Sequence, residues 1–271
     1  MSTMTIDETR ATFLQLHRPG DPLVMPNAWD VGSAKLFASL GARALATTSS
    51  GHAATLGRPD GGVTREEAID HVAALATATP LPVSADLEDC YTADPEGVAA
   101  TIRAAVRAGA AGASVEDYTR DRADPIHDLA LATERVAAAA EAARGSGLVL
   151  TARAENLIRG VDDLGDTIAR LQAYQEAGAD VLFAPGLTDL AEIRTVVGDL
   201  ERPVNVILRP GGPSVPELAE AGVARVSVGG ALCWVGWAAV ADAARELLSV
   251  GTHGYDGAVA DGGRAAGAAF G

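Results

Sequence analysis

The feature that most constrains the fold is an alternation of two kinds of segment along the chain. Short β-branched or apolar runs, typical of buried strands, alternate with alanine-rich segments of helical period. Eight such runs occupy residues 23–27, 44–49, 81–87, 112–117, 148–154, 180–185, 203–208 and 225–230. Eight strand–helix units of about 30 residues each predict an α/β fold, a single (β/α)8 TIM-type barrel.

Local signals at the ends of the expected helices agree with this pattern. Thr64 with Glu67, and Asp94 before Pro95, are typical of helix starts. Glycines stand where four helices are expected to end, at positions 41, 109, 178 and 222. No G-x-G-x-x-G motif follows an early strand, which argues against an open doubly wound sheet. The sequence therefore predicts one barrel domain over residues 1–271.

Composition and charge limit the function classes. With 48% hydrophobic side chains among 271 residues, the chain can bury a full core. A formal net charge of −15 without a basic cluster argues against nucleic-acid binding. No apolar run approaches the roughly 18 residues of a membrane helix, and the N-terminal segment lacks a signal-peptide pattern, so we expect a cytoplasmic protein that binds no membrane. Cys90 and Cys233 show no disulfide or zinc spacing, and we expect both to be reduced.

Charged residues gather at the ends of three neighbouring strands, where barrels of this kind place their active sites. Asp86 and Glu88 end the third strand, Glu116 ends the fourth and Arg153 ends the fifth. A spacing of two residues places Asp86 and Glu88 on the same face of a strand. Other acids at strand ends, such as those at 89, 117 and 155, are more often helix caps or solvated loop residues. The sequence therefore predicts that Asp86, Glu88 and Glu116 converge.

Converging carboxylates repel one another unless a cation holds them. The available ligands are oxygens, and no His/Cys cluster has zinc spacing, so Mg²⁺ is favoured, with Mn²⁺ as a substitute. We expect Asp86, Glu88 and Glu116 to hold this ion, partly through water. The planar fork of Arg153 is suited to clamp a substrate carboxylate or phosphoryl group.

The remaining polar residues carry weaker signals. Residues 47–50 offer hydroxyls and amides after the second strand, and the glycine-rich segments at 209–215 and 227–232 suit either phosphate binding or tight turns. Ordinary surface or packing roles are expected for His17, His71 and His253. His52 and His127 lie near the expected rim without a recognisable partner. Trp234 and Trp237 are expected in the core or at a subunit interface.

Six segments together resemble one known family. In order and spacing, "PNAWDVGSAKLFASLGARALATTSSG", "LGRPDG", "PVSADLE", "GASVED", "LTARAEN" and "YQEAGADVLFAPG" are similar to the isocitrate lyase and phosphoenolpyruvate mutase superfamily. The resemblance runs from about residue 22 to about residue 230. It implies a barrel enzyme that binds an α-oxycarboxylate together with Mg²⁺, typically as a tetramer with a last helix swapped between neighbours. Residues 231–271 are thus expected at the interface of a homo-oligomer, a dimer or a tetramer.

The resemblance also implies roles for individual residues. It implies that four residues after the second strand bind the carboxylate and carbonyl oxygens of an α-keto acid or its enolate. These residues are Thr48, Ser49, Ser50 and Gly51. Asp60 matches an aspartate near the metal site, and Asp86 and Glu88 match the pair of metal-site acids, the second of which is usually Asp. Glu116 matches the third acid, and Arg153 matches the arginine that grips substrate. We take Arg153, Glu116 and Asp60 as the catalytic candidates and add Asn205 to the substrate-binding ones.

The chain also departs from that family. Isocitrate and methylisocitrate lyases carry K-K-C-G-H, with a proton-donating cysteine, after the fourth strand; here the loop reads "YTRDRADPIHD". Cys90 does not replace that cysteine, because it follows the third strand and not the fourth. Pro185 stands where those lyases keep a glutamate after the sixth strand. We therefore expect neither of these two activities. The sequence does not identify the residue that donates the proton. His127, Tyr91 and Tyr118 are the candidates.

Three functions stay open on the sequence. The first is a Mg²⁺-dependent lyase that breaks a C–C bond in a small α-keto acid or 2-hydroxy diacid through an enolate-like intermediate. The second is C–P chemistry, as in a phosphonopyruvate hydrolase or phosphomutase. The third is a non-catalytic protein that binds keto acids. All three imply a small carboxylate ligand.

Overall fold

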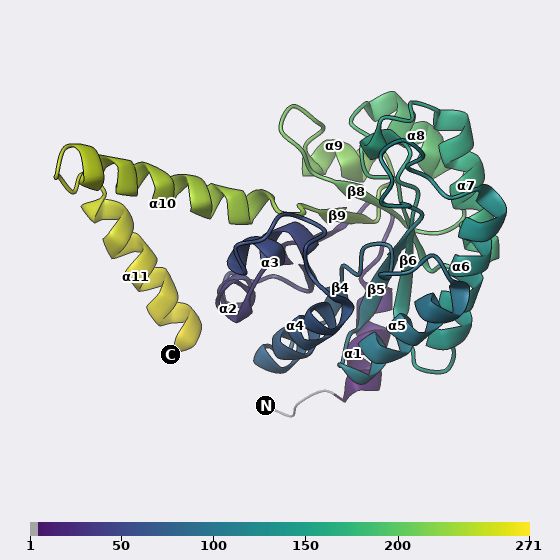
Figure 1. Ribbon diagram of the computed structural model, residues 1–271, viewed down its shortest axis with the longest axis horizontal. Helices are drawn as coiled ribbons and strands as arrows, with labels where there is room; N and C mark the ends of the chain where they lie inside the picture. Colours follow the sequence, from purple (N-terminus) through teal and green to yellow (C-terminus); the bar gives the residue numbers. More distant parts are fainter. Residues whose placement is uncertain (1–4) are drawn as a thin grey trace.

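The computed structural model describes residues 5–271, and within them the chain forms one sheet of nine parallel strands in the order β1-β9-β8-β7-β6-β5-β4-β3-β2 (Figure 1). The strands are β1 (Leu23–Met25), β2 (Asn27–Ala28), β3 (Leu45–Thr47), β4 (Val83–Ala85), β5 (Gly112–Glu116), β6 (Val149–Arg153), β7 (Val181–Phe183), β8 (Val204–Ile207) and β9 (Arg225–Ser227). The TIM-type barrel expected from the sequence is confirmed.

The barrel has nine short strands instead of the expected eight because the first expected strand is divided. Pro26 separates β1 from β2, and proline has no N–H to donate to a sheet ladder. β1 pairs with β9 and β2 pairs with β3, so the two halves of this strand join the ends of the sheet into a nearly closed barrel.

Helices surround the sheet on the outside (Figure 1). They are α1 (Ile6–Gln15), α2 (Val31–Ser39), α3 (Ser49–Thr55), α4 (Arg65–Ala78), α5 (Pro95–Arg107), α6 (Leu129–Ala143), the 3₁₀ turn η1 (Leu157–Arg159), α7 (Leu164–Glu176), α8 (Leu190–Gly198), α9 (Val215–Glu220), α10 (Ala231–Ser249) and α11 (Asp256–Phe270). None of the helices in residues 5–271 is long and apolar enough to cross a membrane.

The expected helix boundaries are confirmed. Thr64 and Glu67 form a reciprocal capping box at α4, and the Asp94 carboxylate accepts the Gly97 N–H at the start of α5. The four predicted stop glycines all have positive φ, from 84° to 107°. These local contacts turn the chain back toward the sheet at regular intervals.

Most of the core lies between the sheet and the helices, where aliphatic side chains such as Leu150, Leu171, Leu182 and Ile193 are fully buried. α1 closes the N-terminal end of the barrel, where the Phe13 ring lies against Gly112. The guanidinium of Arg10, also on α1, donates to three backbone carbonyls nearby. The opposite end, formed by the carboxyl ends of the strands, is left for the site.

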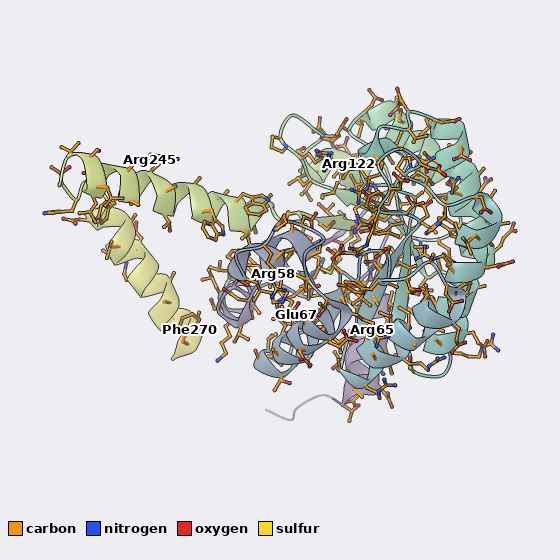
Figure 2. All side chains as sticks on the ribbon, in the orientation of Figure 1. Arg58, Arg65, Glu67, Arg122, Arg245 and Phe270 are labelled. Atoms are coloured by element: carbon orange, nitrogen blue, oxygen red, sulfur yellow. The ribbon has the colours of Figure 1, made fainter. Side chains whose placement is uncertain are left out.

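The last two helices leave the barrel (Figure 1). α10 projects outward, and α11 turns back so that Phe270 lies beside Gly32 of α2 (Figure 2). Their apolar side chains are widely exposed, with Trp237 at 52% and Leu248 at 85%. We call residues 231–270 the helical arm.

Candidate active site

A cavity of about 220 Å³ opens among the carboxyl ends of the strands and continues into the barrel. Most of the residues predicted for the site line it: Thr48, Ser49, Ser50, Asp60, Asp86, Glu88, Glu116, Arg153 and Asn205. Gly51 does not line it. The Gly51 backbone is packed against Trp29 and Cys233, and its N–H donates to Thr48 Oγ1, so it shapes the turn instead of offering a ligand.

Arg153, at the end of β6, is the centre of the charged network. Its Nη1 lies 2.8 Å from Glu116 Oε1 and 3.2 Å from Asp86 Oδ1, and its Nη2 lies 2.8 Å from Glu155 Oε1. Burial disfavours the charged guanidinium, but the three carboxylates outweigh it and raise the Arg153 pKa. Burial raises the pKa of Glu116 well above its usual value despite the attraction of Arg153. The Arg153 fork is therefore already engaged by acids.

Asp86 joins the rim to the turn after β3. Its Oδ2 accepts the Ser49 N–H at 3.0 Å, and its own N–H donates to Thr47 Oγ1 at 2.8 Å. Thr48 Oγ1 and Ser50 Oγ lie 3.2 Å apart beside it. Residues 47–50 are thus held against Asp86 and line the cavity.

The same-face argument for Asp86 and Glu88 is wrong, although both side chains line the cavity. β4 ends at Ala85, and Glu88 has a φ of +52°, so it lies in a turn and not on a strand. Cys90 and Tyr91 also have positive φ, which shows a strained turn. The turn, and not strand alternation, brings Glu88 back to the cavity.

Glu88 is the most unusual acid of the site. Its Oε2 accepts from Arg120 Nη2 at 3.1 Å, whereas its buried Oε1 has no hydrogen-bond partner. Burial, and then the negative charge of Asp86, raise the pKa of Glu88 to about 7. An oxygen without a partner beside a second carboxylate is a place where a cation would be stabilised.

Arg120, in the loop between β5 and α6, was not among the predicted site residues. Its Nε and Nη2 donate to the two carboxylate oxygens of Asp89 at 2.7 and 2.6 Å, and its Nη1 reaches the carbonyl of Gly61. It thus ties three loops together above Glu88. Asp89 therefore pairs with Arg120 and does not line the cavity.

The sequence reasoning also missed Arg159, which lines the cavity from η1. Its Nη2 lies 2.9 Å from Glu155 Oε2, and its guanidinium stacks 3.6 Å above the Tyr118 ring. The only sequence signal was its spacing of four from Glu155, which is common on any helix. Tyr118 therefore supports an arginine, and it does not line the cavity.

The other acids divide into two groups. Asp117 lies behind the site, where it accepts from Tyr174 Oη at 2.6 Å and Arg170 Nη1 at 3.3 Å. Asp60 lies in the exposed loop before α4, and an ion pair between Arg58 and Glu67 anchors this loop (Figure 2). Asp60 therefore lines the cavity, whereas Asp117 does not line it.

Two histidines are more buried than their sequence positions suggested. His52 and His71 stack with ring centroids 3.8 Å apart, and they line a small separate cavity with Tyr91 and Asp86. His17 is buried as well, next to Arg225 inside the barrel. Of the surface or packing roles expected for His17 and His71, the structure gives both a packing role, with His17 buried and His71 half-buried against His52.

The donor set suits a hard divalent cation. No three His, Cys, Asp or Glu side chains within residues 5–271 form a ready-made chelating cluster. Mg²⁺, however, binds through one or two carboxylates with water and substrate completing its shell. Asp86 and the unpartnered Oε1 of Glu88 supply such a pair, whereas Glu116 is turned toward Arg153 and Arg159.

Sequence comparison places the chain among relatives of similar length. It is 37% identical over 240 residues to an uncharacterized protein of Mycobacterium tuberculosis, which covers 87% of this chain and 88% of the relative. It is 29% identical over 209 residues to the 2-methylisocitrate lyase of Escherichia coli, which covers 70% of each.

Solved structures share the fold over most of the chain. A Burkholderia cenocepacia protein assigned as a lyase/mutase has a TM-score of 0.88 at 48% identity, covering 92% of this chain and 90% of its own. 2,3-Dimethylmalate lyase has a TM-score of 0.83 at 28% identity, covering 94% and 91%. Oxaloacetate acetylhydrolase, bound to its product oxalate, has a TM-score of 0.83 at 26% identity, covering 91% and 89%.

A family model completes the assignment. The model described as phosphoenolpyruvate phosphomutase matches residues 13–248, which include every strand of the barrel and every residue of the cavity. The chain belongs to this phosphoenolpyruvate phosphomutase family, within the isocitrate lyase/PEP mutase superfamily.

Proposed function

We propose that this protein is a Mg²⁺-dependent lyase that breaks a C–C bond of a small α-keto acid or 2-hydroxy diacid, with Mn²⁺ as a substitute metal. The supporting observation is Glu88, which lines the cavity together with Asp86, Thr48 and Ser50 and whose buried Oε1 has no hydrogen-bond partner. A site of this kind suits a cation and an oxygen-rich ligand together.

The chain's own residues would divide the work. Asp86 and Glu88 would hold Mg²⁺, which supplies Lewis-acid stabilisation of the negative charge that develops on the C2 oxygen. Thr48 and Ser50 would orient the substrate carboxylate by hydrogen bonds. Arg153 keeps Glu116 and Glu155 from repelling the substrate, and it can donate to a substrate oxygen in place of Asp86.

The relatives support the lyase chemistry. 2-Methylisocitrate lyase and 2,3-dimethylmalate lyase are named for cleavage of small acids, and oxaloacetate acetylhydrolase binds oxalate as product. The loop of residues 117–128 lacks the K-K-C-G-H sequence, so we propose neither isocitrate nor methylisocitrate as substrate.

Phosphonate chemistry is the second candidate. The matching family model is described as a phosphoenolpyruvate phosphomutase, whose name implies phosphoryl transfer. In this version, C–P bond cleavage or phosphomutase action on phosphonopyruvate would use the same cavity.

Purified protein should be incubated with oxaloacetate, 2,3-dimethylmalate and phosphonopyruvate, while pyruvate and phosphate release are measured with Mg²⁺ and with a chelator. We expect metal-dependent turnover of a carbon acid and its loss in the Asp86→Ala variant. Phosphate release would select the C–P alternative. Near-normal turnover in that variant or in excess chelator would overturn the proposal, and binding of pyruvate with Mg²⁺ but without turnover would indicate a non-catalytic protein.

We also propose that the helical arm packs against another copy of this chain. Its exposed apolar side chains, among them Trp234, Trp237 and Val240, form a surface that monomeric proteins rarely leave open to water. A dimer or a tetramer would cover it.

A further inference from the structure

The site cavity does not end at the charged rim. It continues into the barrel past Ser84, Ser114, Thr151 and Ser227, and Arg225 lies at its floor. Barrel interiors are usually filled by bulky branched side chains. Here small polar side chains occupy the interior positions, so space remains beneath Arg153.

Arg225, at the start of β9, is only 3% exposed. Its Nε donates to Asn205 Oδ1 at 2.9 Å, its Nη2 donates to Thr151 Oγ1 at 3.0 Å, and its Nη1 lies 3.3 Å from His17 Nε2. His17 Nδ1 lies 2.9 Å from the carbonyl of Phe13, so the ring donates there and presents Nε2 as an acceptor. All three partners are neutral.

The charge of Arg225 is therefore uncompensated. Among residues 5–271 no carboxylate lies within ion-pair distance of it. Burial, and then the positive charge of Arg153, lower the pKa of Arg225 to about 9. A buried charge without a counter-ion destabilises the folded state unless an anion offsets it.

The contrast with the other arginines of the cavity is informative. Arg153 and Arg159 are already paired with glutamates at the rim. Arg10 and Arg135 are buried without a carboxylate as well, but they donate to backbone carbonyls and do not line the cavity. Arg225 is the arginine that combines an unpaired charge with access to the cavity, and two of its five N–H groups remain for a ligand.

We propose that the floor of the cavity, formed by Arg225, Thr151 and Ser227, is a binding subsite for a carboxylate group. The proposal deepens the proposed function and rests on it for the ligand: the substrate is a diacid with one carboxylate at the rim and the other at this floor. Thr151, which contacts Arg225, and Arg153 lie two residues apart on β6 and point into the same cavity. Two residues advance along a strand by roughly 7 Å, so the rim and the floor are separate levels of one cavity, and a ligand with a carboxylate at each end can contact both.

The test compares the binding of two unreactive four-carbon acids, succinate and butyrate, by calorimetry. Wild-type protein is expected to bind succinate at least about tenfold more tightly than butyrate, and the Arg225→Gln variant is expected to lose this preference. Arg10→Gln is the matched control, since it removes a buried arginine that does not face the cavity and should keep the preference. An unchanged preference in Arg225→Gln would overturn the subsite.

A second measurement separates the possible sources of the anion and does not depend on that variant folding. Succinate binding is measured in sodium gluconate and again in sodium chloride, which shows whether a small free anion competes with succinate. Anomalous scattering from wild-type crystals soaked in bromide shows whether a halide occupies the floor. Competition, or a bromide beside Arg225, would assign the subsite to a free anion as well as to a substrate carboxylate. No succinate preference and no bromide at the floor would refute it. Binding is measured here without turnover. A failure of the proposed reaction can therefore be told apart from a failure of the subsite.

Discussion

The Arg153 Nη1 atom lies 2.8 Å from Glu116 Oε1, and both side chains are largely buried. Removing one partner of such a pair leaves an uncompensated buried charge. Arg153→Met is expected to lower the free energy of unfolding by about 3–5 kcal/mol and to abolish turnover. Urea denaturation measures the first effect. Adding Glu116→Gln should recover part of the stability, and strictly additive losses would contradict the coupling of the two residues.

Glu88 predicts a pH dependence of stability in the metal-free protein. Its pKa is raised from 4.5 to about 7, chiefly by burial, so the folded state holds this proton more tightly than the unfolded state does. The contribution is therefore fully present below pH 4.5 and is lost as the pH rises to 7, by roughly 3 kcal/mol in all. In denaturation curves, wild type and Glu88→Gln should therefore have similar free energies of unfolding near pH 4.5, and their stabilities should diverge as the pH rises to 7, with wild type becoming the less stable. A constant difference would show that Glu88 titrates normally.

Arg120 predicts local order in the loop of residues 117–128. It reaches Asp89, Glu88 and Gly61, whereas the exposed Arg122 in the same loop forms no ion pair within residues 5–271 (Figure 2). Amide hydrogen exchange of the loop is expected to become about tenfold faster in Arg120→Ala and to stay unchanged in Arg122→Ala. Equal protection in both variants would show that the loop holds without Arg120.

The helical arm predicts self-association. Analytical ultracentrifugation of the wild-type chain is expected to show a dimer or tetramer, and the Trp237→Glu/Val240→Glu variant is expected to sediment as a smaller species. Arg245→Glu, on the same helix but at a charged position, is the control and should leave the assembly intact (Figure 2). A wild-type monomer would refute the assignment of the arm to a second copy.

The sequence by itself determined the barrel, because hydrophobic periodicity and helix caps are local properties: Thr64, Asp94 and the stop glycines act on their own neighbours. It also determined which strand ends carry charged side chains, since Asp86, Glu116 and Arg153 follow directly from that pattern. Only tertiary structure decided how these charges pair, that Glu88 reaches the cavity through a positive-φ turn, and that Arg120 and Arg159 close over it. It alone also left Arg225 without a counter-ion, because its partners come from positions up to 208 residues away. Coulombic and hydrogen-bond pairing depends on distance in space, which spacing along the chain does not specify.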